Sequence, residues 1–222
     1  AGAVQVPLGA GGVGVAVADL DGDGRNDLLL ASRSSDPARA GVYVALQDPL
    51  VEGRFLPARR LDAGQSPGHV LATDLDADGR PDLVVANAAI DGRGSGVTVL
   101  LADAARPGQF RPGSFHPMDD AAQASCVADL NGDGLPDLAV AGAVTGLVNH
   151  LQSVGQVFLQ DPAAPGRFVR GGRFAGGDQV RYLAAADLDG DGAVDLVTDE
   201  GPRVLYNDPA RPGSLQAPRP LS

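Results

Sequence analysis

The 222-residue sequence contains no tryptophan, no lysine and a single cysteine, Cys126. One cysteine cannot build an internal disulfide framework or a thiolate-rich zinc site. No apolar run approaches the ~18 residues that a transmembrane helix requires, so the sequence predicts no membrane span. The net charge of −11 argues against a nucleic-acid backbone or an anionic membrane as the main partner.

Glutamate is also scarce, since Glu52 and Glu200 are the only two and the other 26 acidic residues are aspartate. The 31 glycines and 17 prolines disfavour long helices, while 44% hydrophobic residues suffice for a buried core. Aspartate favours turns and binds hard metal ions. The positions of the aspartates therefore decide what the chain can do.

Four nearly identical segments recur along the chain. They read ADLDGDGRNDLLL from Ala18, TDLDADGRPDLVV from Thr73, ADLNGDGLPDLAV from Ala128 and ADLDGDGAVDLVT from Ala186, at spacings of 55, 55 and 58 residues. One half of each repeat has a fixed length and the insertions fall in a single connection. A period of this length indicates a propeller or a solenoid.

The first repeat predicts four short strands, over residues 13–20, 27–30, 41–46 and 54–61, each bounded by glycine, proline or aspartate. Four strands per repeat indicate an all-β propeller, with residues 1–222 forming one domain of four blades. We expect a closed four-blade ring, because an open array would expose an apolar blade face. The alternative is a segment of a larger propeller, or a dimer. Residues 1–7 and 216–222 would compete for one strand position in a closed ring.

The chemistry lies in the acidic loops at residues 19–27, 74–82, 129–137 and 187–195. Each loop has oxygen-bearing side chains at positions 1, 3, 5 and 9, a glycine at position 6, and a backbone carbonyl available at position 7. Oxygen donors without histidine or cysteine select a hard cation, and such carboxylate-rich loops suit Ca²⁺ better than Mg²⁺. Four filled loops would change the formal charge from −11 to −3. We therefore predict up to four Ca²⁺ sites, formed by Asp19, Asp21, Asp23, Arg25 and Asp27; Asp74, Asp76, Asp78, Arg80 and Asp82; Asp129, Asn131, Asp133, Leu135 and Asp137; and Asp187, Asp189, Asp191, Ala193 and Asp195.

The loop pattern D-x-[DN]-x-D-G-x-x-D-L, with an apolar strand on either side, resembles the FG-GAP/VCBS repeats of integrin-α-type β-propellers. The resemblance covers all four repeats and implies a calcium-binding blade with the same ligand positions. The family usually builds seven or eight blades, whereas this chain has four repeats. The resemblance does not imply integrin-like ligand binding, because related propellers serve in adhesion, sugar binding, polysaccharide cleavage and surface assemblies.

Other motifs predict little chemistry. The stretch from Gly9 to Gly14 matches G-x-G-x-x-G, but a strand follows where a dinucleotide fold needs a helix. The three histidines, His69, His116 and His150, fall at unrelated places in the repeat. Cys126 is expected in the core. No catalytic motif is present, so we expect no enzyme.

We therefore expect an exported, non-enzymatic scaffold that is stabilised by calcium and contacts a partner protein. Export is expected because weak calcium loops fill at extracellular concentrations. The start at Ala1, without Met or a leader, fits a mature exported protein and a shortened chain equally well. The contacts are expected in the variable connections, residues 31–40, 86–96 and 141–155. The alternatives are a carbohydrate-binding lectin and, less favoured, a polysaccharide lyase or hydrolase domain.

Overall fold

The computed structural model describes residues 12–89, 94–119, 121–143, 153–177, 180–199 and 203–216. Every regular element in these ranges is a β-strand, and no helix there is long and apolar enough to cross a membrane. The all-β fold expected from the repeats is thus confirmed. The motif at residues 9–14 lies partly outside the described ranges, and Gly12 and Gly14 are in the first strand.

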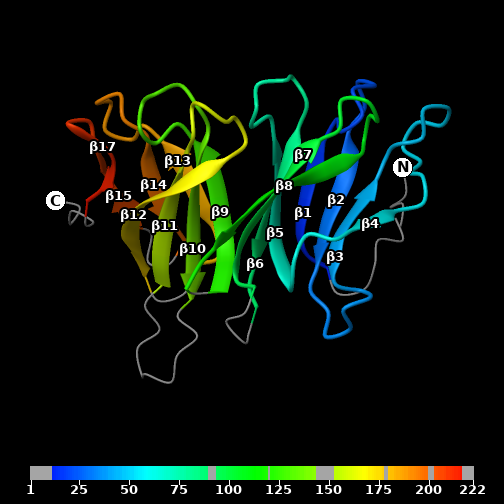
Figure 1. Cartoon of the computed structure of the whole chain (residues 1–222), viewed down its shortest axis with the longest axis horizontal. Helices are drawn as coiled ribbons and strands as arrows, with labels where there is room; N and C mark the ends of the chain where they lie inside the picture. Colours follow the sequence, from blue (N-terminus) through cyan, green and yellow to red (C-terminus); the bar gives the residue numbers. More distant parts are fainter. Residues whose placement is uncertain are drawn as a thin grey trace.

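The strands form four antiparallel units that follow one another along the chain (Figure 1). We call these units blades 1 to 4. Neighbours in sequence are neighbours in each sheet, as in a meander. Blade 4 consists of a three-stranded and a two-stranded sheet. The strands are, in blade 1, β1 (Gly12–Ala18), β2 (Asp27–Ser32), β3 (Gly41–Ala45) and β4 (Arg59–Leu61); in blade 2, β5 (Pro67–Thr73), β6 (Asp82–Asn87), β7 (Gly96–Ala102) and β8 (Phe110–Pro117); in blade 3, β9 (Ala121–Ala128), β10 (Asp137–Ala143), β11 (Ser153–Gln160) and β12 (Phe168–Gly177); and in blade 4, β13 (Leu183–Ala186), β14 (Asp195–Thr198), β15 (Arg203–Leu205), β16 (Asn207–Asp208) and β17 (Arg211–Leu215).

The core lies between blades. Leu29 and Val44 of blade 1 pack with Val70 and Val85 of blade 2, and similar clusters join blade 2 to 3 and blade 3 to 4. The runs of consecutive apolar residues in β6 and β10 are buried throughout because these strands have a blade on either side. Cys126 is buried in the cluster between blades 3 and 4, as expected.

The fourth strand of blade 1 is shorter than the sequence predicts. Residues 54–61 were expected to be one strand, but β4 covers only Arg59–Leu61. An isolated bridge joins Gln47 to Phe55, and Leu56 N–H donates to Leu46 O at 2.8 Å. Pro57 then interrupts the ladder because it has no N–H to donate.

The four blades form an open row rather than a closed ring. Packing runs from β1 to β5, from β5 to β9 and from β9 to β13, and no comparable packing joins blade 4 back to blade 1 among the described residues. Blade 1 and blade 4 stand at opposite ends of the molecule (Figure 1). The described residues therefore do not show the closed four-blade ring. They form a propeller segment, which is the alternative that the repeats allowed. The competition expected between residues 1–7 and 216–222 lies outside the described residues except for Gln216.

The two ends of the blades differ in their loops. The acidic loops, which join the first and second strands, lie at the upper end in Figure 1, together with the hairpins that join the third and fourth strands. The connection between β2 and β3 lies at the lower end. This separation places the predicted metal loops at one end and the predicted contact connection of blade 1, residues 31–40, at the other.

Candidate metal centre

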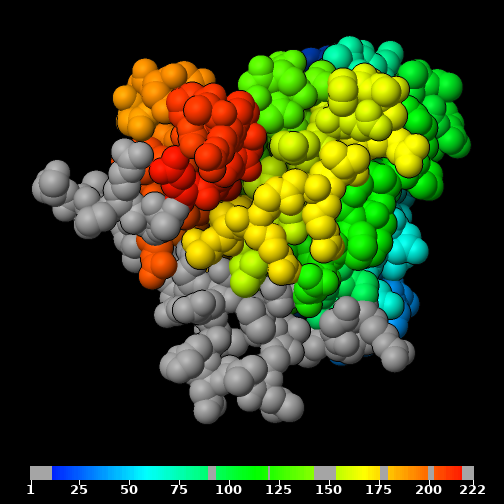
Figure 2. All heavy atoms as spheres, turned by 60° about the vertical axis from the view of Figure 1, so that its left-hand side comes forward, coloured from blue at the N-terminus to red at the C-terminus, as the bar shows by residue number. Residues whose placement is uncertain are grey.

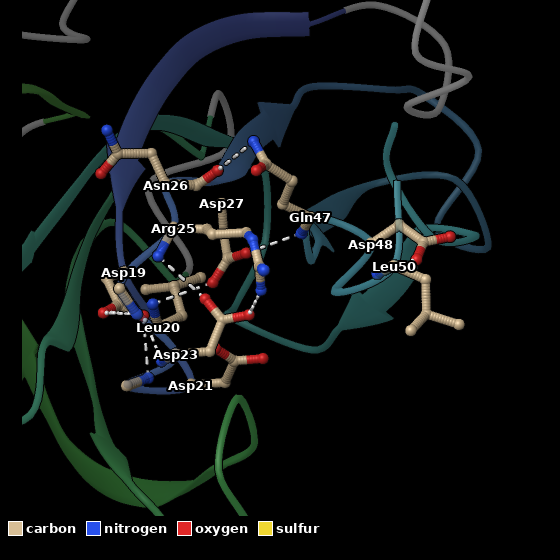
Figure 3. Close-up of polar contacts among 12 residues, drawn as sticks. Asp19, Leu20, Asp21, Asp23, Arg25, Asn26, Asp27, Gln47, Asp48 and Leu50 are labelled. Atoms are coloured by element: carbon tan, nitrogen blue, oxygen red, sulfur yellow. Dashed lines mark hydrogen bonds and ion pairs between the residues drawn. The ribbon is translucent and has the colours of Figure 1, made fainter. Parts of the chain in front are cut away.

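The acidic loop of blade 1 wraps around the side chain of its first aspartate. Asp19 Oδ1 accepts from the N–H groups of Gly22 and Asp23, at 2.8 and 3.1 Å, and its Oδ2 accepts from Gly24 N–H at 2.8 Å (Figure 3). Gly24 has φ +85°, a left-handed conformation that favours glycine. The same position-6 glycine has a similar φ in the other three loops. In blade 1 this loop brings Asp19 and Asp21 close to Asp27.

The aspartate at position 9 ties each loop to its own blade. Asp27 Oδ2 accepts from Leu20 N–H at 2.9 Å, and its Oδ1 accepts from Gln47 N–H, just after β3, at 2.7 Å. The remaining blades repeat this pair of bonds at 2.7–3.0 Å, with Asp82, Asp137 and Asp195 as acceptors. The sequence predicted the carboxylate but not these donors, because every residue except proline has a backbone N–H whatever its side chain.

Three of the four loops bring three carboxylates close together. In each of them, one oxygen from each of three aspartates lies within 4.8 Å of the others. The clusters contain positions 1, 3 and 9 in blades 1 and 4, and positions 1, 3 and 5 in blade 2. Their members are Asp19, Asp21 and Asp27; Asp74, Asp76 and Asp78; and Asp187, Asp189 and Asp195.

The position-5 side chain and the third loop depart from the expected arrangement. Asp23 is paired with the Arg25 guanidinium at 2.8 Å, and Asp78 with Arg80 at 3.0 Å. The arginines at position 7 were predicted for their carbonyls, yet their side chains hold the neighbouring carboxylate. In the third loop, Asn131 Nδ2 donates to Asp133 Oδ2 at 3.0 Å, so the loop contains an internal bond between two predicted ligands.

The residues present fit a hard cation. Asp76 Oδ1 in the second loop is buried and has no hydrogen-bond partner among the described residues. A buried carboxylate oxygen without a partner is costly, and a cation at the centre of the loop would satisfy it. The neighbouring donors are carboxylate oxygens, as Ca²⁺ prefers. The loop side chains would hold the ion, which would supply positive charge to bind the acidic turn together.

Electrostatics within the loops also favour a cation. Burial raises the pKa of Asp82 and of Asp137 to about 6, and the nearby loop aspartates add to the effect. Burial and the charge of Asp23 raise the pKa of Asp21. The hydrogen bond from Arg25 N–H holds the pKa of Asp23 below its usual range. Carboxylates with raised pKa values are destabilised as anions, and a bound divalent cation would reverse this effect.

The acidic loops also lie at the junctions between blades. Gly108, in the hairpin between β7 and β8, donates its N–H to Leu20 O in the loop of blade 1 at 3.1 Å. A Cβ at Gly108 would come within 3.4 Å of Asp21 Cβ. Between blades 3 and 4, Asn207 Nδ2 donates to Leu130 O at 2.7 Å. A cation that orders these loops would therefore stiffen the contacts between neighbouring blades.

The histidines within the described residues have structural partners. His69 Nδ1 lies 3.0 Å from Ser125 Oγ across the junction of β5 and β9. His116 Nε2 lies 2.6 Å from Ser114 Oγ, and its ring packs on Phe158 and Phe168 at centroid distances of 5.4 and 5.6 Å. Burial lowers the pKa of both imidazoles. His150 lies outside the described residues.

Comparison with family models identifies the repeat. Residues 19–85, 74–140 and 129–198 each match the FG-GAP-like repeat, so the matches together cover most of the chain. The chain belongs to the FG-GAP-like repeat family. Each match starts at the first aspartate of one acidic loop and ends in the strand after the next acidic loop. Each match therefore spans two successive acidic loops, and consecutive matches overlap at one loop.

No curated protein matches the sequence of this FG-GAP-like chain. Among solved structures, it is similar to the V. cholerae biofilm matrix protein Bap1, with 12% sequence identity and a TM-score of 0.41. That match covers 95% of this chain and 61% of Bap1. The chain thus spans less than two thirds of the length of that protein.

Proposed function

We propose that this chain is a non-enzymatic scaffold of an exported protein, held rigid by Ca²⁺ at one end of its blades and contacting a partner protein at the other. The acidic loop recurs at the same end of all four blades, and the loops of blades 1 and 3 are hydrogen-bonded to the following blade; this observation carries the proposal. Calcium at these positions would order both the loop and the blade junction. Loops of modest affinity fill at the calcium concentrations found outside cells, which favours an exported location.

The opposite end has the features of a contact surface. The connection between β2 and β3 and the segment after β4 line a pocket of about 760 Å³ that is open to solvent. Arg60 and Asp62 line it together with Ser34, Gln65 and Ser66. The second and third variable connections, residues 86–96 and 141–155, fall partly outside the described residues. The charged groups, amides and hydroxyls that line the pocket can exchange hydrogen bonds with a polar partner surface.

A matched pair of single-charge variants tests the location of the contact surface. Asp62→Ala removes an exposed carboxylate at the pocket, and Glu52→Ala removes one from the hairpin at the calcium end. Proteins from the native source are captured on each calcium-loaded variant and on the parent chain. We expect the captured partner to be lost with Asp62→Ala and retained with Glu52→Ala. Equal capture by both variants would contradict the assignment of the contact surface to this end.

The same pocket also favours a second candidate, a carbohydrate ligand, because the hydroxyl, amide, guanidinium and carboxylate groups in its lining can form hydrogen bonds to sugar hydroxyls. A glycan array probed with the parent chain and Asp62→Ala separates the two candidates. Binding of a defined glycan by the parent, lost in Asp62→Ala, would favour the lectin over the protein scaffold.

A further inference from the structure

Blade 1 exposes an apolar face that is covered in the blades that follow it. Val13, Val15 and Val17 of β1 are 53, 65 and 55% exposed. The residue one repeat after Val15 is Val70, which is only 1% exposed because blade 1 packs against it. The partly exposed side chains of Leu28 and Leu30 in β2 continue the same face, since they pair with Val17 and Val15. We call this surface the near face of blade 1.

Blade 4 exposes the surface that packs against the following blade in blades 1 to 3. Tyr182 is 69% exposed, Ala184 is exposed, and Val197 and Val204 are partly exposed. The residue equivalent to Val197 in blade 2 is Val84, which is fully buried against blade 3. In Figure 2, blade 4 (orange and red) stands at the left edge of the coloured atoms, and no other coloured segment lies beyond it. We call this surface the far face of blade 4.

These two faces are the two halves of an interface that the chain already makes three times. At each junction, the far face of one blade packs on the near face of the next. Between blades 1 and 2 the far face contributes Leu29 and Val44, and the near face contributes Val70 and Leu83. The far face of blade 4 carries Val197 and Val204 at the positions of Leu29 and Val44, by strand register. A second copy of the chain therefore offers the shape and chemistry that each uncovered face lacks.

We propose that two copies of this chain dock head to tail, with the near face of blade 1 in each copy against the far face of blade 4 in the other. The two contacts are equivalent and close a ring of eight blades, four from each copy. Closure buries both apolar faces at once, and the side chains at their centres are valine, leucine, alanine and tyrosine. Arg60 lies in the outermost strand of the near face, where it already donates to the backbone oxygens of Ala40 and Pro37. The interface continues the packing found between successive blades within one chain.

The mass of the calcium-loaded 222-residue chain in solution tests the proposal. We expect twice the 22.4 kDa chain mass by light scattering coupled to size exclusion. Val15→Glu on the near face and Val197→Glu on the far face should each reduce the mass to that of one chain. Val169→Glu is the matched control, because Val169 is 54% exposed on β12, away from both faces, and it should leave the dimer intact.

Mixing the two monomeric variants makes the test specific for head-to-tail docking. In a mixture of the two variants, the Val197→Glu copy keeps its near face intact and the Val15→Glu copy keeps its far face intact. These two faces can form one of the two contacts, so the dimer should reappear. Circular dichroism of each variant in calcium checks that the blades have folded, and Val17→Ser provides a milder near-face variant. A monomeric parent chain, a mass above two chains, or no dimer in the mixture would each overturn the proposal. So would a dimer that survives either Val15→Glu or Val197→Glu.

Discussion

The position-9 aspartates serve the fold and the candidate metal site together. Both oxygens of Asp137 accept backbone N–H groups, from Leu130 at 3.0 Å and from Gln160 at 2.8 Å. A carboxylate oxygen has a second lone pair, so it can accept these bonds and still face a cation. Replacing Asp137 would leave two buried N–H groups without acceptors, which damages the blade as well as the site. Substitutions at positions 3 and 5 therefore report more cleanly on calcium.

We predict that the third loop binds calcium most weakly. It has Asn131 where the other loops have aspartate, so it offers three carboxylates rather than four, and ligand charge tunes calcium affinity. The bond from Asn131 to Asp133 must also be broken before both can face an ion. Asn131→Asp should tighten the third site, and Asp133→Ala should abolish it.

A calcium titration followed by NMR can resolve the four sites. The amides of the position-6 glycines, Gly24, Gly79, Gly134 and Gly192, report on one loop each. The amide signal of Gly134 should be the last to reach its calcium-bound chemical shift as calcium is added. The predicted order of calcium affinities is wrong if the third loop fills first. It is also wrong if Asn131→Asp leaves unchanged the calcium concentration at which the third loop is half-filled.

His69 should make the calcium-loaded protein less stable as the pH falls. Burial lowers the pKa of its imidazole in the folded state, so below about 6.5 the unfolded chain binds more protons than the fold. The contribution of neutral His69 is complete above that pH and is lost as the pH decreases. Chemical denaturation at pH 7.5 and pH 5 in saturating calcium should show a smaller loss for His69→Gln than for the parent. Equal losses would mean that His69 does not contribute to the pH dependence.

At the scale of the elements, each acidic loop turns twice through left-handed conformations. Position 6 is glycine in all four loops. Position 4 is glycine in three, whereas the second loop has Ala77 with φ +60°. An alanine in this region has its Cβ close to the following carbonyl oxygen, a contact that glycine avoids. The second loop therefore carries local strain that the other three do not.

Two opposite substitutions at position 4 measure this strain. Gly22→Ala should lower the free energy of unfolding by about 1 kcal/mol, because φ +77° disfavours alanine, while the space around the new Cβ is open. Ala77→Gly should leave the stability unchanged or raise it, since relief of strain offsets the greater freedom of the unfolded chain. Urea denaturation with excess calcium gives both values. A stabilising effect of Gly22→Ala would show that the loop conformation differs from the one described here.

At the scale of the whole molecule, calcium should govern thermal stability because the acidic loops brace the blade junctions. A site filled at ~100 times its dissociation constant stabilises the fold by about 2.7 kcal/mol, which raises the melting temperature of a domain this size by roughly 5–10 °C. Chelation should therefore lower the melting temperature sharply, and added calcium should restore it. Magnesium should restore much less, since it requires strict octahedral geometry. Identical melting curves with and without chelator would contradict structural calcium.

The repeat, the four acidic loops and the all-β blades could be predicted from local patterns of residues. A spacing of 55 residues and alternating oxygen ligands are local patterns, and each loop is built from neighbours in the chain that hydrogen-bond to one another. The burial of β6 and β10 on both faces was likewise readable from their continuous apolar residues. The fourth strand of blade 1 begins at Arg59 instead of Arg54, because Pro57 interrupts the expected backbone pairing.

Whether the row of blades closes into a ring could not be predicted from the sequence of the repeats. Val15 and Val70 occupy the same place in the repeat, yet one is exposed and the other is buried, because only Val70 has a blade in front of it. Ring closure depends on small rotations that add up over all blades, and no single repeat encodes their sum. The backbone donors to the position-9 aspartates were hidden for a related reason, since an N–H exists in nearly every residue and the fold selects which one faces the carboxylate.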